Sequence, residues 1–397
     1  MRHLFRRTCA AVAAAALAAT MSPAAAVDAT GSREATLTPW EAGAVLRSAP
    51  LPEELWIPHA TSRAWKLTYL TYDSHGQLAR STGTVFIPHG TPPRGGWPVI
   101  SWAHGLSGLG DDCAPSKVGP VLKHRDWSYL RTWMNEGYAI VASDYVGLGT
   151  PGLMPYLDGR ATAHSVVDMV KAGREFTSGL APRLQLGRRW VTIGQSQGGG
   201  ASVYTARYAS EYGGPGLSFR GAVGTGTPAY IEDYVMLLGP ELPPVTITPD
   251  LAAYLTYIIA SLRDVHPELG IDGILTEKGK KYVEMSETMC DEEFAEAMDG
   301  VAVGEFFTAP MASLPDIYPT LKDYMGMPEE GFDTPFFIAH GVADVDVPYA
   351  QTARYAGVLT GNGEPVTFKS YPTDHSGTMQ ESLADTIPFV RAQMRRR

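Results

Sequence analysis

Val191-Thr192-Ile193-Gly194-Gln195-Ser196-Gln197-Gly198-Gly199-Gly200 is the stretch that decides the fold. Its β-branched start predicts a strand, and the residues that follow, 201–208, have the composition of a helix. A serine in the pattern Gly-x-Ser-x-Gly between a strand and a helix sits on a tight, strained turn, so the residues beside it must be small. Gly194 and Gly198 meet this requirement. The stretch predicts that the Ser196 hydroxyl projects from the end of a strand, the alternative being a glycine-rich turn without chemistry.

Strands and helices alternate along most of the chain. The helical patterns cover 161–177 and 351–359, and the predicted strands are 64–72, 82–88, 99–103, 138–143, 191–193, 221–224, 336–339 and 366–371. The first two strands are separated by turn residues and predict an antiparallel hairpin. Strand–helix alternation in the remainder predicts an α/β fold with a mostly parallel central sheet and helices on both faces.

One interval, residues 230–328, offers helical patterns but no strand. These patterns cover 251–262, 274–289 and 291–298, and the first is too short to span a bilayer. A structureless loop of this length is uncommon inside a compact domain, so we expect a helical cap inserted between two parts of an α/β core, residues 63–229 and 329–397. Its helices either form ordinary core or line an acyl-binding pocket.

The N-terminus has the order of a secretory signal peptide. Basic residues precede an Ala-rich apolar run over 9–20, and small residues continue to Ala26. We expect residues 1–26 to be removed near Ala26 and the protein to be secreted without a permanent membrane anchor, an uncleaved anchor being the alternative. The pair Arg6-Arg7 leaves twin-arginine export open beside the general secretory route. Residues 27–62 are expected to form an N-terminal arm lying against the domain.

Export changes the net charge and the number of cysteines. The chain carries −10, and the loss of the three arginines of residues 1–26 makes the mature charge −13. This charge argues against nucleic acid as a partner and against attraction to anionic lipid surfaces. Of the three cysteines, Cys113 and Cys290 remain after cleavage. In an oxidising compartment such a pair is expected to form a disulfide, with two buried free thiols as the alternative.

A serine nucleophile needs a base, and the base needs an acid that orients it. In α/β-hydrolases the three follow in the chain order Ser, Asp or Glu, His, each after a strand. Asp344 follows the strand at 336–339 and is the expected acid, with Asp346 as the rival. His375 follows the last predicted strand and is the expected base. The ordered set Ser196, Asp344 and His375 predicts a catalytic triad.

Backbone N–H groups must stabilise the oxyanion that forms during acyl transfer. One donor is expected at Gln197, directly after the nucleophile, and the second in the loop that begins at His104. We assign the second donor to Leu106, with Ser107 as the alternative, and expect His104 to hold the loop.

No cofactor and no metal is expected. The sequence has no His-Glu-x-x-His, no Cys-x-x-Cys, no P-loop and no Gly-x-Gly-x-x-Gly after a strand. The glycine-rich segment 147–152 lacks the lysine and the helix start of a phosphate site, and is expected to shape the rim of the site.

Several segments together resemble the secretory lipase family of the α/β-hydrolase superfamily. They span roughly residues 65–390 and are Gly194-Gln195-Ser196-Gln197-Gly198-Gly199, Asp112-Cys113-Ala114-Pro115-Ser116, Asp144–Gly152, Gly226-Thr227-Pro228, His266-Pro267 and the loops that carry Asp344 and His375. The resemblance implies an α/β-hydrolase fold, hydrolysis of carboxylic esters under a helical cap, and a disulfide from Cys113 to a cap cysteine, here Cys290.

The expected function is therefore that of a secreted serine esterase or lipase acting on acylglycerols or similar acyl esters. An exported peptidase or acyltransferase could use the same triad, the ester could belong to a polymer, and a non-catalytic binding protein could share the fold.

Overall fold

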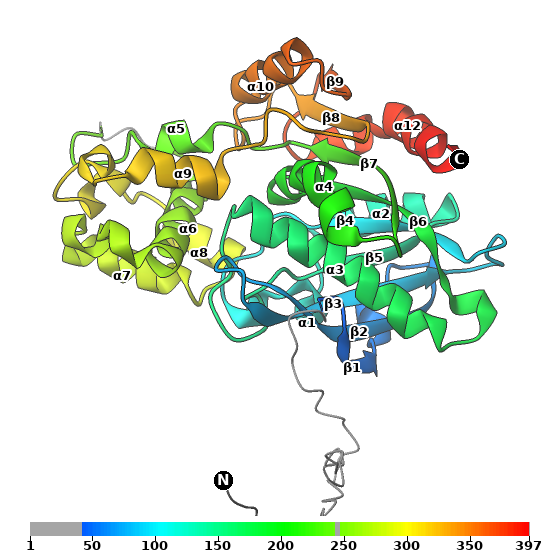
Figure 1. Ribbon diagram of the computed structural model, residues 1–397. Coiled ribbons are helices and arrows are strands. Elements are labelled where there is room, and N and C mark those ends of the chain that lie inside the picture. Colours follow the sequence, from blue (N-terminus) through cyan, green and yellow to red (C-terminus); the bar gives the residue numbers. More distant parts are fainter. Residues whose placement is uncertain (1–41, 243–246, 397) are drawn as a thin grey trace, which may run out of the picture. The chain divides into compact units, whose positions relative to one another are not determined.

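Nine strands form one sheet in the computed structural model, which describes residues 42–242 and 247–396 (Figure 1). The strands are β1 (Val45–Pro50), β2 (Thr61–Tyr72), β3 (Leu78–Pro88), β4 (Trp97–Ala103), β5 (Ala139–Ser143), β6 (Leu186–Gln195), β7 (Ser218–Thr225), β8 (Phe336–Gly341) and β9 (Val366–Tyr371). Their order across the sheet is β1-β2-β3-β5-β4-β6-β7-β8-β9. From β5 to β9 all neighbours are parallel, and the predicted α/β class is confirmed.

The other end of the sheet is antiparallel. β2 and β3 form the expected hairpin, in which Tyr72 pairs with Leu78, and β3 pairs antiparallel with β5. The edge strand β1 was not anticipated from the sequence and pairs antiparallel with β2. It lies within the proposed N-terminal arm; the rest of that arm, residues 27–41, and the predicted signal peptide lie outside the described residues.

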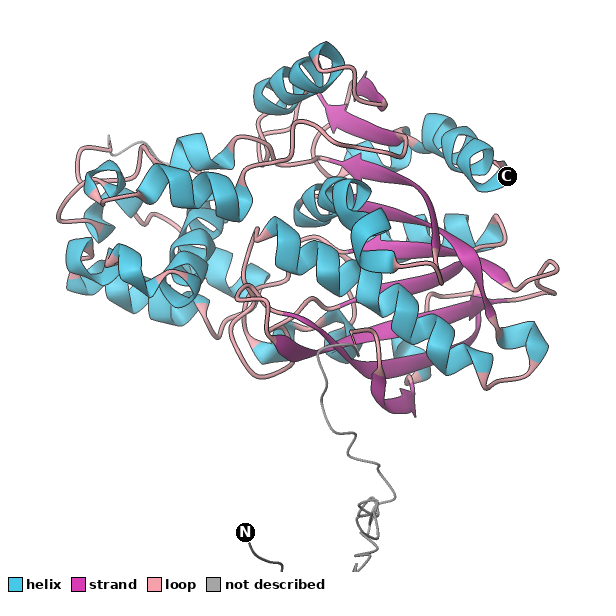
Figure 2. Cartoon of the chain, viewed as in Figure 1, coloured by secondary structure: helices cyan, strands magenta, loops and turns pink. Residues whose placement is uncertain are grey.

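Helices cover both faces of the sheet (Figure 2). α2 (Lys123–Asn135) and α12 (Leu383–Arg395) pack on one face, and α3 (Gly159–Ser178), α4 (Gln197–Gly213) and α10 (Tyr349–Gly361) pack on the other. Successive strand residues point to opposite faces, so Val99 packs with α3 while Ile100 packs with α2. Two short helices complete the core, α1 (Pro115–Val118) and α11 (Gly377–Glu381).

The described residues between β7 and β8 form helices and turns, which lie to one side of the sheet (Figure 1). The helices are α5 (Ile231–Val235), α6 (Pro249–Val265), α7 (Glu277–Ser286), α8 (Asp291–Ala297) and α9 (Ile317–Met325). The helix expected over 274–289 starts later than predicted, because Leu275 is extended and the Thr276 side chain caps α7 by accepting from the Gly279 N–H. Among the described helices none has the length and apolar character needed to cross a membrane.

The segment between β7 and β8 contacts the loop that follows β4. Cys113 and Cys290 form the expected disulfide, with their Cα atoms 5.3 Å apart. Gly108 and Cys290 also form an antiparallel bridge, and the Asp291 N–H donates to the Ser107 carbonyl at 3.1 Å. Covalent and backbone contacts thus hold the start of α8 against the loop that carries the candidate oxyanion donors.

Candidate active site

Ser196 occupies the strained turn that its sequence context predicts. It lies between β6 and α4 with φ +60° and ψ −124°, a conformation that residues with a side chain rarely adopt. A Cβ on Gly194 would lie 2.0 Å from the Gly198 carbonyl oxygen, and a Cβ on Gly198 would lie 1.9 Å from that of Ala103. Both positions therefore require glycine, as expected. Within residues 191–200 Ser196 alone is not fully buried, which leaves its side chain accessible.

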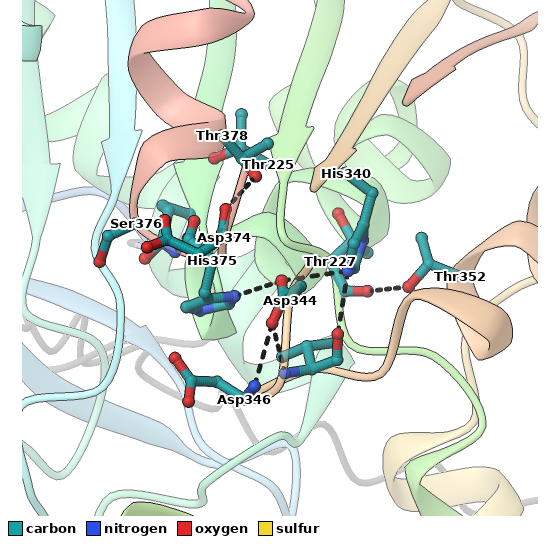
Figure 3. A network of polar contacts seen from close by, with 12 residues as sticks. Thr225, Thr227, His340, Asp344, Asp346, Thr352, Asp374, His375, Ser376 and Thr378 are labelled. Atoms are coloured by element: carbon teal, nitrogen blue, oxygen red, sulfur yellow. Dashed lines mark hydrogen bonds and ion pairs between the residues drawn. The ribbon is translucent and has the colours of Figure 1, made fainter. Parts of the chain in front are cut away.

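Asp344 and His375 meet beyond the carboxyl ends of β8 and β9 (Figure 3). The His375 Nδ1 atom lies 2.6 Å from Asp344 Oδ2, and both side chains are buried. The other carboxylate oxygen, Oδ1, accepts the backbone N–H groups of Asp346 at 3.1 Å and Val347 at 2.8 Å. Asp344, rather than its rival Asp346, thus carries the contact to the imidazole.

His340 is a second partner of Asp344 that the sequence pattern did not reveal. Its ring is fully buried, and Nε2 lies 3.1 Å from Asp344 Oδ2 and 3.0 Å from the Val347 carbonyl oxygen. Burial alone would raise the pKa of Asp344, but the hydrogen bonds from His340 and His375 and the charge of His375 hold this pKa well below its ordinary value. The carboxylate is therefore ionised wherever a histidine base works.

The strand end of β7 connects the nucleophile and the base. The Ser196 N–H donates to the Thr225 carbonyl at 2.9 Å, and the next residue, Gly226, lies against the His375 ring. Gln195 Nε2 donates to the His375 carbonyl at 3.4 Å. Within the described structure the Ser196 hydroxyl and the His375 ring form no hydrogen bond with each other, a contact that often tightens only when substrate binds.

The loop after β4 runs beside the nucleophile. A Cβ on Gly105 would lie 3.6 Å from Ser196 Cβ, so this peptide borders the reacting centre. His104 has the expected structural role, because its ring stacks on Tyr145, whose hydroxyl donates to the His104 carbonyl at 2.8 Å. Leu106 is partly buried, whereas Ser107 is buried and its hydroxyl has no partner among the described residues. Gln197 starts α4 and is buried beside Ser196.

An apolar pocket with an empty volume of about 920 Å³, open solvent at its mouth included, extends from Ser196 and Gln197 toward the cap. Its walls come mainly from α5, α6 and the segment between them. They include Ile231, Tyr234, Leu237, Leu238, Leu242, Ile247, Leu251, Tyr254, Leu255 and Ile258. Such a lining suits a hydrocarbon chain, because burial of apolar surface stabilises the bound state. Asp346 is the one charged residue among the described residues of this lining.

The carboxylates of Asp344 and Asp346 and the His375 ring each offer an atom within 4.8 Å of the others, a grouping that could hold a metal ion. The 2.6 Å contact between Asp344 and His375 is, however, a hydrogen-bond separation in a buried pair. A metal at this place would have to replace that bond, so the arrangement suits a base oriented by an acid better than a set of metal ligands.

Comparison with known proteins agrees with this geometry. A family model described as secretory lipase matches residues 114–390, which is more than half of the chain. The chain belongs to the secretory lipase family. It is therefore a carboxylic ester hydrolase of the lipase and esterase class, with the α/β-hydrolase fold, and its family membership indicates an extracellular protein.

Individual relatives of this chain are distant in sequence. It is 24% identical over 384 residues to lipase A of Moesziomyces aphidis, which covers 88% of this chain and 76% of that protein. It is 25% identical over 341 residues to a protein of Mycobacterium tuberculosis described as a probable inactive lipase, covering 82% of this chain and 72% of that one. The structure of Candida antarctica lipase A in its closed state superposes with a TM-score of 0.72 at 20% identity, covering 89% of this chain and 82% of that one.

Proposed function

We propose that this secretory lipase is exported and hydrolyses acylglycerols or similar acyl esters through an acyl-enzyme on Ser196. The observation that carries the proposal is the position of Ser196 in the wall of the apolar pocket that α5 and α6 line. A hydrocarbon chain in this pocket would bring its ester carbonyl to the serine on the strained turn.

His375 supplies the base. The His375 Nδ1 atom lies 2.6 Å from Asp344 Oδ2. In the tautomer with the proton on Nδ1, Nε2 is therefore free to accept the Ser196 proton. Asp344 orients the ring and stabilises the imidazolium that forms. The serine oxygen attacks the carbonyl carbon, and His375 then passes its proton to the leaving alcohol. Water, deprotonated by the same ring, then attacks the acyl carbon. The bond from this carbon to the Ser196 oxygen breaks, His375 returns the proton to that oxygen, and the carboxylic acid leaves.

The Gln197 N–H and a second N–H from the loop after β4 stabilise the oxyanion. Leu106 is our choice for the second donor and Ser107 the alternative. Loss of one such donor costs about 10²–10³ in kcat in serine hydrolases. Because the Asp291 N–H holds the Ser107 carbonyl, the cap helps to fix this loop.

The domain arrangement that goes with this function is a signal peptide over 1–26, a core over 63–229 and 329–397, and a cap over 230–328 that supplies the acyl pocket. Its support is the absence of sheet strands from the described part of the interval between β7 and β8. Sequencing the N-terminus of the exported protein would locate the cleavage site.

Two other functions use the same residues or the same fold. An exported peptidase or acyltransferase would use the same triad with a different acyl donor or acceptor. A non-catalytic binding protein with this fold is the second alternative, because one relative is described as a probable inactive lipase. The experiment is a panel of p-nitrophenyl esters of increasing chain length, run beside peptide and acyl-acceptor substrates with the wild type and Ser196→Ala. Faster hydrolysis of esters than of peptides, lost in Ser196→Ala, is the expected result. Faster peptide turnover, or ester turnover that survives in Ser196→Ala, would contradict it.

A further inference from the structure

We infer that Asp346 selects the acyl group by charge: its carboxylate admits uncharged acyl chains to the pocket and disfavours chains that carry a carboxylate of their own. This inference rests on the proposed function of the pocket as the acyl site. It makes Asp346 a specificity-determining residue for the ester, distinct from the residues that carry out the reaction.

The first observation is the place of Asp346 in the pocket wall. It lines the pocket together with Ser196, Val347 and Pro348, while the other described lining residues are uncharged and mostly apolar. Asp346 is partly buried, and the protein groups around it in this wall are mostly apolar, so few of them screen its charge. A second negative charge brought into the pocket therefore meets repulsion that a neutral chain does not.

The second observation is that, in the part of the chain that the structure describes, the Asp346 carboxylate forms no hydrogen bond with His375, because Asp344 forms that bond. An oxygen of the Asp346 carboxylate lies within 4.8 Å of an oxygen of Asp344 and of a ring nitrogen of His375. The Asp346 backbone is fixed by its N–H, which donates to Asp344 Oδ1 at 3.1 Å. Among the described residues no lysine, arginine or histidine nitrogen lies within 4.0 Å of the Asp346 carboxylate, as an ion pair would require. Its charge is thus not neutralised by a paired cation.

The charged surroundings of Asp346 are mostly negative. Burial raises its pKa, the His375 charge lowers it, and Asp344, Asp250 and Asp374 raise it further, with a net result above the ordinary value. Because this pKa is raised, the charge of Asp346 is tested at mildly alkaline pH, which favours the carboxylate. Solvent screens part of the repulsion between this partly buried carboxylate and a second negative charge, so we expect an effect of about tenfold in affinity.

The test compares two esters of six-carbon acyl chains, p-nitrophenyl hexanoate, whose chain ends in a methyl group, and the mono-p-nitrophenyl ester of adipic acid, whose chain ends in a carboxylate. The ratio of their kcat/KM values is measured at mildly alkaline pH for the wild type and for Asp346→Asn. We expect the wild type to prefer the hexanoate and the variant to raise the relative kcat/KM of the adipate ester by about tenfold or more. Asp374→Asn is the matched control, because Asp374 neighbours His375 but lines a different groove; its ratio should equal that of the wild type.

An unchanged ratio in Asp346→Asn, or an equal change in Asp374→Asn, would overturn the inference. If Asp346→Asn is too slow for kinetics, calorimetric titration of the two intact esters in a Ser196→Ala background supplies the same comparison as Kd values. There the added Asp346→Asn change should tighten binding of the adipate ester relative to the hexanoate, and equal effects on both would contradict charge selection. Failure of the proposed function itself would show differently, as ester turnover that persists in Ser196→Ala.

Discussion

Gly226 lies directly against the ring of His375. A Cβ on this glycine would stand 2.7 Å from His375 Cε1 and 2.8 Å from Nδ1, closer than carbon and nitrogen atoms can pack. Gly226 also has φ +57°, which favours glycine. The residue after β7 therefore determines where the imidazole of the proposed base can sit.

Gly226→Ala should displace His375 from Asp344 and lower kcat by about 10²-fold or more, since small misplacements of catalytic groups are costly. KM for a long-chain ester should change little, because the apolar pocket is untouched. Gly214→Ala is the control: Gly214 has φ +63° but open space around its Cβ position. It should lower the melting temperature without lowering kcat. Equal kcat in Gly226→Ala and the wild type would contradict this account of the ring position.

The two aspartates of the acid loop should differ sharply in their effect on kcat. Asp344→Asn keeps the shape of the side chain but presents an amide to Nδ1, which favours the wrong tautomer of His375, and kcat should fall by about 10⁴-fold. Asp346→Asn should lower kcat for a neutral ester far less, because Asp346 does not hold the imidazole. Steady-state kinetics on a short p-nitrophenyl ester compares them. A larger loss in Asp346→Asn would reverse the assignment of the acid.

Asp291 should make the folded protein less stable as pH rises. Burial raises its pKa to about 7, assisted by the nearby carboxylates of Asp250, Glu292 and Asp346. The unfolded-state pKa of an aspartate is about 3.9. When the folded-state pKa is higher, the full contribution of the group to the free energy of unfolding is present only at pH values below this unfolded-state pKa. This contribution is lost as pH rises from about 4 to about 7.

Asp291→Asn removes this titration but keeps the backbone N–H that bonds Ser107. The melting temperature of the variant relative to the wild type should therefore be higher above pH 7 than near pH 4. Thermal unfolding at several pH values measures the difference. A difference that does not vary with pH would show that Asp291 does not titrate in this way.

The disulfide between Cys113 and Cys290 should matter for both stability and rate. It joins residues 177 positions apart, and closure of so long a loop stabilises the fold by about 4–5 kcal/mol in the chain-entropy model. The double variant Cys113→Ala/Cys290→Ala should lose part of this stability and some kcat, because Ser107 and the oxyanion loop are tied to the same cap segment.

The control for the disulfide is chemical reduction. A reductant should lower the melting temperature of the wild type toward that of the double variant and leave the double variant itself unchanged. If reduction left the melting temperature and the kcat of the wild type unchanged, the disulfide would contribute neither to stability nor to the position of the oxyanion loop.

Much of this fold follows from local patterns. The glycine spacing around Ser196 specifies the strained turn because only glycine fits at Gly194 and Gly198, and the alternation of apolar strands with helices specifies a parallel sheet. The chain order of Ser196, Asp344 and His375 predicted that these three side chains lie at the carboxyl ends of parallel strands. In the structure Asp344 and His375 form a hydrogen bond there.

Other features depend on strand pairing and on the course of the loops, which residue patterns do not specify. β1 lies in a stretch rich in Pro, Ala and Ser, and its pairing with β2 outweighs its weak strand pattern. His340 lies near the end of β8, and its contact with Asp344 depends on the turn after this strand, in which the Asp344 N–H donates to the Gly341 carbonyl at 3.2 Å. Asp346 was visible only as a rival acid, since the direction of its side chain into the pocket depends on how the loop folds.

The central claim is that Ser196 is a nucleophile activated by His375. The most direct measurement is labelling with a fluorophosphonate, followed by mass spectrometry of the modified peptide, in the wild type, Ser196→Ala and His375→Ala. The account predicts stoichiometric modification at Ser196 in the wild type, none in Ser196→Ala, strongly slowed labelling in His375→Ala, and loss of ester hydrolysis in step with modification. Modification at another residue, or full hydrolytic activity after Ser196 has been labelled, would contradict it.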